Sequence, residues 1–354
     1  MSTANPKPHK INFVDTTLRD GMSSVSHQFT PANVAAIAAG LDAGGIGTIE
    51  VAHGIGIGAS SLQYGRAVAT DPEYVAAAVG AVENADIAVL YVPGISTIPV
   101  LADCIEAGIK TVRVAVHCTE ADCGQQPIEW AKEQGLTVMT FLMMSHKLEV
   151  EPLTEQARKL ASYGADVVYV VDSAGAMVPE QAAARVSSFV SALDTEVGFH
   201  SHNNLGVAIG NALAAAEAGA TYIDGSLRGL GASAGNAQTE VMAAAFERAG
   251  WETGANIWPL IDTAEQVLAP LMKQPQIVDE TALMLGYAGV YSTFFHPTKR
   301  AADKYHLSSR DILLELGRRN IIGGQEDMII DVAAEMSAER STSQMSAERN
   351  GVPA

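Results

Sequence analysis

Eight short runs rich in β-branched and other apolar residues recur between the start of the chain and Trp251, with Ala-rich segments of helical character between them. We expect strands at Ile11–Leu18, Gly47–Ala52, Ile87–Val92, Thr111–His117, Thr137–Met143, Val167–Asp172, Val197–His202 and Tyr222–Leu227. Alternation of this kind is typical of parallel sheets with helical crossovers. Eight such units close a barrel of about 250 residues. The sequence therefore predicts an α/β fold, a TIM (β/α)8 barrel.

The residues at the expected helix ends favour the same fold. Thr30 precedes a helix expected at Pro31–Asp42 and can cap it, and a proline opens the helix expected at Pro179–Leu193. An open, doubly wound sheet is the alternative. Such a sheet usually has a Gly-rich phosphate loop after its first strand, whereas here that strand runs into Thr-Leu-Arg-Asp-Gly. We therefore favour the closed barrel.

Beyond Trp251 the strand and helix alternation stops and a mostly helical stretch follows. The pattern predicts a barrel domain at 8–260 and a small C-terminal helical domain at 261–335. The remaining residues, 336–354, are Ser-rich and contain Met-Ser-Ala-Glu-Arg twice, beginning at Met336 and at Met345. Polar, repetitive composition of this kind favours a disordered tail.

Charge and composition exclude several classes of protein. The formal net charge of −18 opposes binding to nucleic acid or to an anionic membrane. No apolar run approaches the roughly 18 residues that cross a bilayer, and the first ten residues lack the apolar core of a signal peptide. The 3 cysteines are too few and too scattered for a disulfide framework. We expect a soluble, cytoplasmic protein with no nucleic-acid or membrane partner.

Two histidines close the seventh expected strand, in the order His200, Ser201, His202. Because side chains alternate along a strand, His200 and His202 point to the same side, roughly 6 to 7 Å apart. A pair of imidazoles needs only a carboxylate to form a facial site for a divalent transition metal. The alternative is two histidines held by hydrogen bonds.

An acid for this pair is available at the end of the first expected strand. The active site of a TIM barrel lies at the C-terminal ends of its strands, and the first strand leads into Arg19 and Asp20. Asp20 is therefore the candidate third ligand, although an acid at a strand end can instead cap the next helix. Arg19 beside it is suited to clamp the carboxylate of a 2-oxo acid and to stabilise an enolate, or else to form a structural ion pair.

Several motifs carry a resemblance to a known family. The stretches 15–21 (DTTLRDG), 200–203 (HSHN) and 229–236 (GLGASAGN) resemble the metal-dependent TIM-barrel lyases related to isopropylmalate synthase, the DRE-TIM metallolyases. Within that group the chain is most similar to the 4-hydroxy-2-oxovalerate aldolases, through 49–54 (IEVAHG), 117–122 (HCTEAD), 171–175 (VDSAG) and 322–327 (IGGQED). The likeness runs from about residue 10 to 335.

The resemblance implies a divalent metal, preferably Mn²⁺ but with Co²⁺ or Mg²⁺ as alternatives, held by Asp20, His200 and His202. It implies a class II aldolase that cleaves a 4-hydroxy-2-oxo acid to pyruvate and an aldehyde, or runs the reverse addition, through a pyruvate enolate. Arg19 would steady the enolate, while Ser173 and Tyr291 would contact the substrate beside His200. Tyr291 alone would otherwise be interpreted as a core aromatic residue. The helical domain would dock an acylating acetaldehyde dehydrogenase.

The chain departs from this family at Ser23, where the pattern has a histidine that acts as general base on the 4-hydroxyl. A serine hydroxyl has no useful proton affinity near neutral pH, and a positioned base contributes about 10²–10⁴ in rate. We therefore expect ordinary aldolase activity to suffer. A relayed water or His53 are the candidate replacements, because the family already has a histidine at the position of His27.

Two further departures, Ile55 and Tyr91, fall near the same end of the barrel and predict a reshaped acceptor pocket. Our hypothesis is an aldolase of altered specificity. Two alternatives stay open. One is a Claisen-type acyl-CoA condensing enzyme with the same metal triad, and the other is an impaired paralogue that scaffolds a dehydrogenase. Ser23 favours the scaffold, whereas the presence of all the expected metal ligands opposes it.

Overall fold

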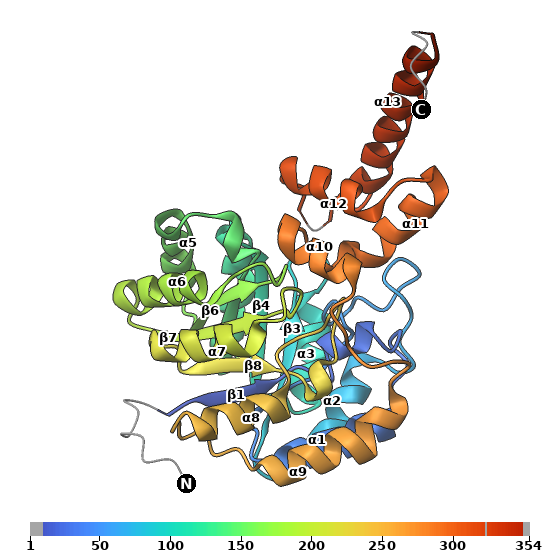
Figure 1. Ribbon diagram of the computed structural model, residues 1–354. Helices are drawn as coiled ribbons and strands as arrows, with labels where there is room; N and C mark the ends of the chain where they lie inside the picture. The colour runs from blue at the N-terminus through green and yellow to red at the C-terminus, as the bar shows by residue number, and fades with distance from the viewer. Residues whose placement is uncertain (1–9, 323, 350–354) are drawn as a thin grey trace.

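The computed structural model describes residues 10–322 and 324–349. Its centre is a closed barrel in which eight parallel strands follow one another in sequence order (Figure 1). The strands are β1 (Asn12–Asp15), β2 (Thr48–Glu50), β3 (Asp86–Tyr91), β4 (Thr111–His117), β5 (Thr137–Met143), β6 (Val167–Asp172), β7 (Glu196–Ser201) and β8 (Tyr222–Gly225). The barrel and all eight strand positions expected from the sequence are confirmed.

The strands that lead into the site end earlier than expected. β1 stops at Asp15, because the backbone turns at once: the amides of Arg19 and Asp20 both donate to the carbonyl of Thr16. A short 3-10 helix, η1 (Asp20–Ser23), follows. β7 likewise ends at Ser201, so His202 is the first residue beyond it. The polar residues therefore stand on turns at the barrel mouth, where side chains can converge.

Eight helices surround the strands (Figure 1). They are α1 (Pro31–Ala43), α2 (Asp71–Val79), α3 (Ile98–Glu106), α4 (Gln125–Glu133), α5 (Val150–Ser162), α6 (Pro179–Ala192), α7 (Ala208–Glu217) and α8 (Thr239–Arg248). Thr30 caps α1 as expected, since its side chain accepts from the amide of Asn33 while the Asn33 side chain accepts from the amide of Thr30. Such caps fix where each helix starts and therefore how each loop leaves the barrel mouth.

The barrel extends further along the chain than the sequence indicated. α9 (Ile257–Asp262) and a π-helix η5 (Thr263–Leu268) pack on α1, and a 3-10 turn η6 (Ala269–Leu271) packs on η5. Two glycines permit this contact, Gly40 within α1 and Gly44 just after its end: a Cβ at Gly44 would lie 2.4 Å from Leu260, and one at Gly40 would lie 2.1 Å from Thr263. Leu260 and Leu268 belong to the barrel core. The structure therefore keeps residues 257–271 with the barrel, past the boundary expected at 260.

A second, smaller core belongs to the helical domain, which lies above the barrel in Figure 1. The domain contains α10 (Glu280–Ala288), a 3-10 turn η7 (Ser292–Phe294), α11 (Phe295–Tyr305), α12 (Ser309–Arg318) and α13 (Met328–Arg349). Leu285, Phe294, Leu313 and Val332 are fully buried in its core. The residues after α10 contact the end of β5: the Tyr291 hydroxyl lies 3.7 Å from the Met143 sulfur. This domain therefore docks at the C-terminal ends of the strands.

The disordered tail expected from residue 336 is not what the structure has over its described part. α13 continues to Arg349 and includes both Met-Ser-Ala-Glu-Arg repeats, and Figure 1 shows it projecting away from the rest of the molecule. Met, Ala, Glu and Arg are strong helix formers, so local propensity outweighs the repetitive composition here. Residues 350–354 lie outside the described residues.

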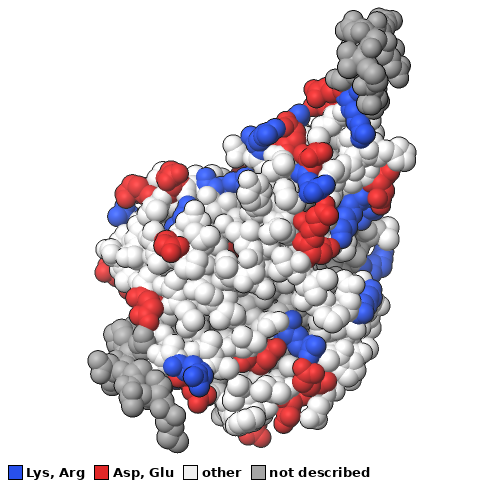
Figure 2. Space-filling view, in the orientation of Figure 1, with Lys and Arg blue, Asp and Glu red and all other residues white. Residues whose placement is uncertain are grey.

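The surface mixes charges of both signs. Figure 2 shows Lys and Arg beside Asp and Glu, most densely over the helical domain. Ion pairs there include Arg319 with Glu315 at 2.9 Å and with Glu335 at 2.8 Å. In the part of the chain that the structure describes, no helix has the length and apolar character needed to cross a membrane.

Candidate metal and substrate site

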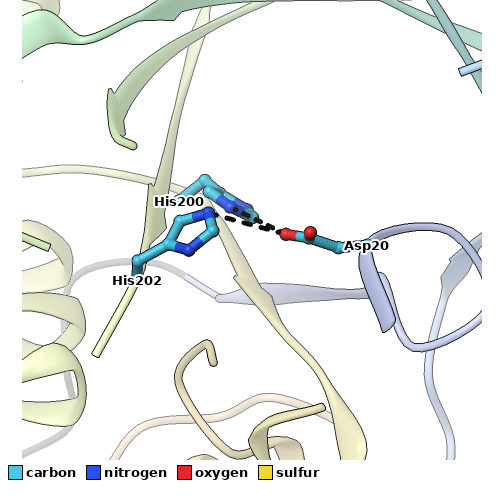
Figure 3. Close-up of side chains that lie close together, drawn as sticks. All are labelled: Asp20, His200 and His202. Carbon is cyan, nitrogen blue, oxygen red and sulfur yellow. Dashed lines mark ion pairs between the residues drawn. The ribbon is translucent and has the colours of Figure 1, made fainter. Parts of the chain in front are cut away.

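Three potential metal ligands meet at the mouth of the barrel. Asp20 opens η1 just after β1, while His200 and His202 come from the end of β7 and the residue beyond it. Figure 3 shows the two imidazoles turned toward the carboxylate. The Nε2 atoms of His200 and His202 lie 3.7 and 3.6 Å from the same oxygen, Oδ2 of Asp20. One ligand atom from each of the three residues lies within 4.8 Å of the other two.

The protonation of these groups fits a cation. Burial alone would raise the pKa of Asp20, but the charges of Arg19 and the histidines outweigh it and lower that pKa to about 2. Burial lowers the pKa of His202 to about 4. Asp20 is therefore an anion and His202 a neutral imidazole at neutral pH, as metal ligands must be. Two imidazoles and one carboxylate form the facial set that leaves coordination positions open.

A neighbouring carboxylate fixes how His200 presents its ring. His200 Nδ1 lies 2.8 Å from Oδ2 of Asp224 on β8. A carboxylate can only accept, so the proton resides on Nδ1 and the Nε2 lone pair faces Asp20. Asn236 orients the third ligand, because its amide donates to Oδ2 of Asp20 at 3.0 Å. The expected ligands are thus brought together and held by hydrogen bonds.

Arg19 lies beside the ligand cluster in a fixed orientation. Its Nε donates to Oε2 of Glu50 at 2.7 Å, and its Nη1 lies 3.6 Å from Oδ1 of Asp20. Only 7% of Arg19 is exposed. Arg19 thus forms a structural ion pair, the alternative to a role in substrate binding. The ion pair with Glu50 also holds the Arg19 guanidinium next to the carboxylate of Asp20. An anion seated at the mouth would meet this charge.

Comparison with known proteins identifies relatives along nearly the whole chain. A family profile described as HMGL-like matches residues 10–267, and one described as DmpG-like communication domain matches residues 276–338. A protein of Rhodococcus opacus named 4-hydroxy-2-oxovalerate aldolase 2 is 77% identical over 332 residues, which cover 94% of this chain and 96% of the relative. The 4-hydroxy-2-oxovalerate aldolase of Carboxydothermus hydrogenoformans is 56% identical over 93% of this chain and 98% of its own length.

The chain belongs to the 4-hydroxy-2-oxovalerate aldolase family. Among solved structures, the carboxyl transferase domain (Y628A) of Rhizobium etli pyruvate carboxylase with pyruvate superposes with a TM-score of 0.79 at 17% identity, covering 94% of this chain and 61% of that one. The N-terminal domain of a putative aldolase from Bacteroides vulgatus gives 0.70 at 21% identity, covering 81% of this chain and 95% of that one. These likenesses are of fold.

Tyr291 of this family member lies at the end of β5, where its hydroxyl is 3.7 Å from the sulfur of Met143. Burial raises its pKa to about 12. Ser173 follows β6 and is 3% exposed, and its hydroxyl accepts from the amide of Met144 at 3.0 Å. Tyr291 thus contacts a residue at the barrel mouth, and Ser173 contacts the backbone of Met144. The substrate contacts of both remain predictions.

Ser23 ends η1, and the residues around it limit which group can replace the expected base. A Cβ at Gly54 would lie 2.3 Å from the Ser23 hydroxyl, so the serine faces that loop. His53 is fully buried, and both of its ring nitrogens have backbone partners, the carbonyl of Gly65 at 3.1 Å and the amide of Ile55 at 3.2 Å. His53 is therefore not the free base that the sequence left open.

Tyr91 does not line the barrel interior. Leu90 clusters with interior residues such as Phe141, whereas Tyr91 packs in the layer between strands and helices. Successive side chains of a strand point to opposite faces, so Tyr91 must face away from the interior if Leu90 faces into it. The expectation that Tyr91 reshapes an acceptor pocket lacks support from this arrangement. Ile55 remains at the mouth, half-buried on the loop that follows β2.

Two residues of the site were given no role from the sequence. Asp224 lies next to the site because β8 is placed between β7 and β1 in the closed barrel. Asn236 lies in a loop that pairs with His202. An acid inside the apolar run of β8 was a usable signal for Asp224, since buried acids are rarely unpaired. Asn236 closes the motif at 229–236 that carries part of the family resemblance, but nothing in that motif indicates a contact with Asp20.

Proposed function

We propose that this chain is a divalent-metal-dependent aldolase that cleaves a 4-hydroxy-2-oxo acid to pyruvate and an aldehyde, or adds pyruvate to an aldehyde. The observation that carries this proposal is the convergence of Asp20, His200 and His202 beside the guanidinium of Arg19. The names of the relatives supply the substrate class. We propose Mn²⁺ as the metal, with Co²⁺ or Mg²⁺ as substitutes, because imidazole and carboxylate ligands with open positions suit such ions.

The charge of the buried network supports an anionic substrate. Asp20, Glu50 and Asp224 bring three negative charges, and Arg19 and Arg113 bring two positive charges. One negative charge is left, which favours binding of a cation. With a divalent ion the balance becomes one positive charge, and the carboxylate of a 2-oxo acid would neutralise it. A neutral carbonyl compound without that carboxylate would not.

A divalent ion held here would supply Lewis-acid polarisation of the 2-oxo group. The guanidinium of Arg19 would stabilise negative charge that develops on the 2-oxo oxygen, since Glu50 and Asp20 already fix its position. Tyr291 would close the site from the helical domain and contact the substrate with its hydroxyl, which remains protonated because its pKa is about 12. Ser173 would help to hold the carboxylate end. Position and chemistry support these roles.

The second proton, on the 4-hydroxyl, needs a different group. Ser23 can hold a water molecule but has no proton affinity of its own near neutral pH. We therefore propose that a water beside Ser23 accepts this proton, and that the chain cleaves 4-hydroxy-2-oxovalerate more slowly than a histidine-containing relative. Ile55 at the mouth favours an acceptor aldehyde larger or more apolar than acetaldehyde.

The helical domain supports a proposal about a partner. Its match to the DmpG-like communication domain and its position over the barrel mouth favour docking of an acylating acetaldehyde dehydrogenase. On α10 the apolar side chains Leu283 and Tyr287 are 46% and 72% exposed. A partner would cover them. We propose that the enzyme acts in the cytoplasm with this partner.

The test of the proposed function is metal-dependent release of pyruvate. Chelator-treated protein is supplied with racemic 4-hydroxy-2-oxovalerate, and pyruvate is measured with and without added Mn²⁺. We expect release only with Mn²⁺, loss of it in Asp20→Asn, and retention in Asp166→Asn. Asp166 is a matched carboxylate, because it lies just before β6 at the opposite end of the barrel and binds Lys132 and the amide of Val138. Equal release by Asp20→Asn would overturn the proposal.

A further inference from the structure

Arg113 occupies the centre of the barrel, directly below the site. It comes from the middle of β4, and none of its side chain is exposed. Its Nη1 lies 3.2 Å from Oε2 of Glu50, and its Nη2 lies 2.5 Å from Oδ2 of Asp224. One planar guanidinium therefore bridges two carboxylates that come from β2 and β8.

Arg113 donates a hydrogen bond to Asp224, whereas its contact with Glu50 is an ion pair, and each of these two carboxylate oxygens accepts a hydrogen bond from a residue of the proposed site. Oε2 of Glu50 accepts from Nε of Arg19 at 2.7 Å, and Oδ2 of Asp224 accepts from Nδ1 of His200 at 2.8 Å. The contacts form one continuous chain from Arg19 through Glu50, Arg113 and Asp224 to His200. Its two ends are the guanidinium proposed for the enolate and an imidazole proposed for the metal.

We propose that Arg113 is a positioning residue that couples these two ends through Glu50 and Asp224. This inference rests on the proposed function. The rigid guanidinium of Arg113 is hydrogen-bonded to Asp224 and paired by charge with Glu50, so the two carboxylates share one planar cation that fixes how they lie relative to each other. Movement of the Glu50 or the Asp224 carboxylate therefore moves Arg113 and, through it, the other carboxylate. The orientation of Arg19 and the direction of the His200 lone pair are thus set together.

Aromatic packing prevents the fork from turning. The guanidinium carbon of Arg113 lies 4.2 Å from the ring centre of Phe141 and 5.0 Å from that of Tyr169. Phe141 also lies against His200, with ring centres 6.0 Å apart. A lysine at 113 would keep a positive charge but has a single ammonium group without the planar fork. Arg113→Lys therefore removes the bridge without removing the charge.

A purely structural ion pair is the competing account, and affinity measurements separate the two. A structural role changes the stability of the protein, whereas loss of a carboxylate that orients a metal-binding histidine typically weakens metal affinity by about 10- to 100-fold. Mn²⁺ affinity reports on the His200 end. Pyruvate KM and kcat, measured at saturating Mn²⁺ by exchange of the pyruvate methyl protons, report on the Arg19 end.

The test compares Arg113→Lys, Asp224→Asn and Glu50→Gln, with Asp166→Asn as the control. Mn²⁺ dissociation constants come from electron paramagnetic resonance of the free ion. We expect Asp224→Asn to weaken Mn²⁺ binding about 10- to 100-fold. Glu50→Gln should change mainly pyruvate KM and kcat, and Arg113→Lys should change both Mn²⁺ affinity and pyruvate kinetics. Asp166→Asn should change neither. An Arg113→Lys protein altered at one end only, or at neither, would overturn the coupling.

Two controls keep the outcomes distinct. If Arg113→Lys does not fold, judged by circular dichroism, the double variant of Glu50→Gln and Asp224→Asn replaces it. Coupling then predicts that the changes in Mn²⁺ affinity and in pyruvate kinetics caused by the two single substitutions do not add in the double variant. Additive changes would overturn the coupling. If the unaltered protein fails to bind Mn²⁺, or Asp20→Asn binds it equally well, the proposed metal site itself is wrong and the coupling fails with it.

Discussion

The imidazoles of His27 and His53 lie stacked, with ring centres 3.7 Å apart and planes 14° apart. Burial lowers the pKa of both rings, that of His27 to about 4, so the stack is neutral at neutral pH. The ring nitrogens bind the loop that follows β2, including the amide of Gly54 at 3.4 Å from His27 Nδ1. The pair therefore holds this loop beside Ser23 and leaves Ser23 without a histidine base.

Replacing Ser23 by histidine should restore a general base. We expect Ser23→His to raise kcat/KM for cleavage of 4-hydroxy-2-oxovalerate by about 10²-fold or more, because a positioned base contributes about 10²–10⁴. Steady-state release of pyruvate measures the effect. The matched control is Ser23→Asn, which adds bulk without a titratable group. If Ser23→His stays at the level of Ser23→Asn, the absent base does not limit cleavage.

His27 should make stability depend on pH. Between about pH 6.5 and about pH 4 the unfolded chain protonates this histidine while the folded protein does not, so the free energy of unfolding falls as the pH falls. Burial raises the pKa values of Asp15 and Asp172 to about 6, so these two groups make the free energy of unfolding rise as the pH falls. Their contribution is the same in the unaltered protein and in a His27 variant. We expect His27→Gln to flatten the net loss of Tm between pH 6.5 and pH 4. Parallel Tm curves for the two proteins would contradict this.

Gly198 and Gly210 should respond oppositely to alanine. Gly198 on β7 faces Tyr169, and a Cβ there would lie 2.5 Å from the tyrosine ring. We expect Gly198→Ala to cost about 1–3 kcal/mol by overpacking. In α7, a Cβ at Gly210 would meet only Pro179 at 3.8 Å, so Gly210→Ala should stabilise by about 0.5–1 kcal/mol. Urea unfolding of both variants measures these changes. The packing account fails if both variants shift in the same direction.

The barrel could be predicted because each βα unit carries its own local signals. Apolar runs mark the strands, and residues such as Thr30 mark the helix starts. The boundary near residue 260 could not be placed. Whether Leu260 belongs to the barrel depends on the approach that Gly44 permits, and this contact joins residues far apart in the sequence. The helical conformation of the C-terminal residues up to Arg349 was not predicted for a different reason, because their repetitive composition was given more weight than their helix propensity.

The site was predictable to the extent that residues close in sequence carried it. His200 and His202 indicated a metal by their spacing, and Asp20 followed from its place at a strand end. Asp224 was missed because its role comes from barrel closure, which sets β8 between β7 and β1. The side of the strand on which Tyr91 lies was missed because strand register was not fixed by the sequence.

The measurement that tests the central claim most directly is exchange of the pyruvate methyl protons in deuterated water, followed by proton NMR. It requires the metal ligands and Arg19 but no acceptor aldehyde and no base at position 23. We predict exchange with added Mn²⁺, none above background without metal, and loss of exchange in His202→Ala. Absence of Mn²⁺-dependent exchange, or full exchange in His202→Ala, would contradict the account.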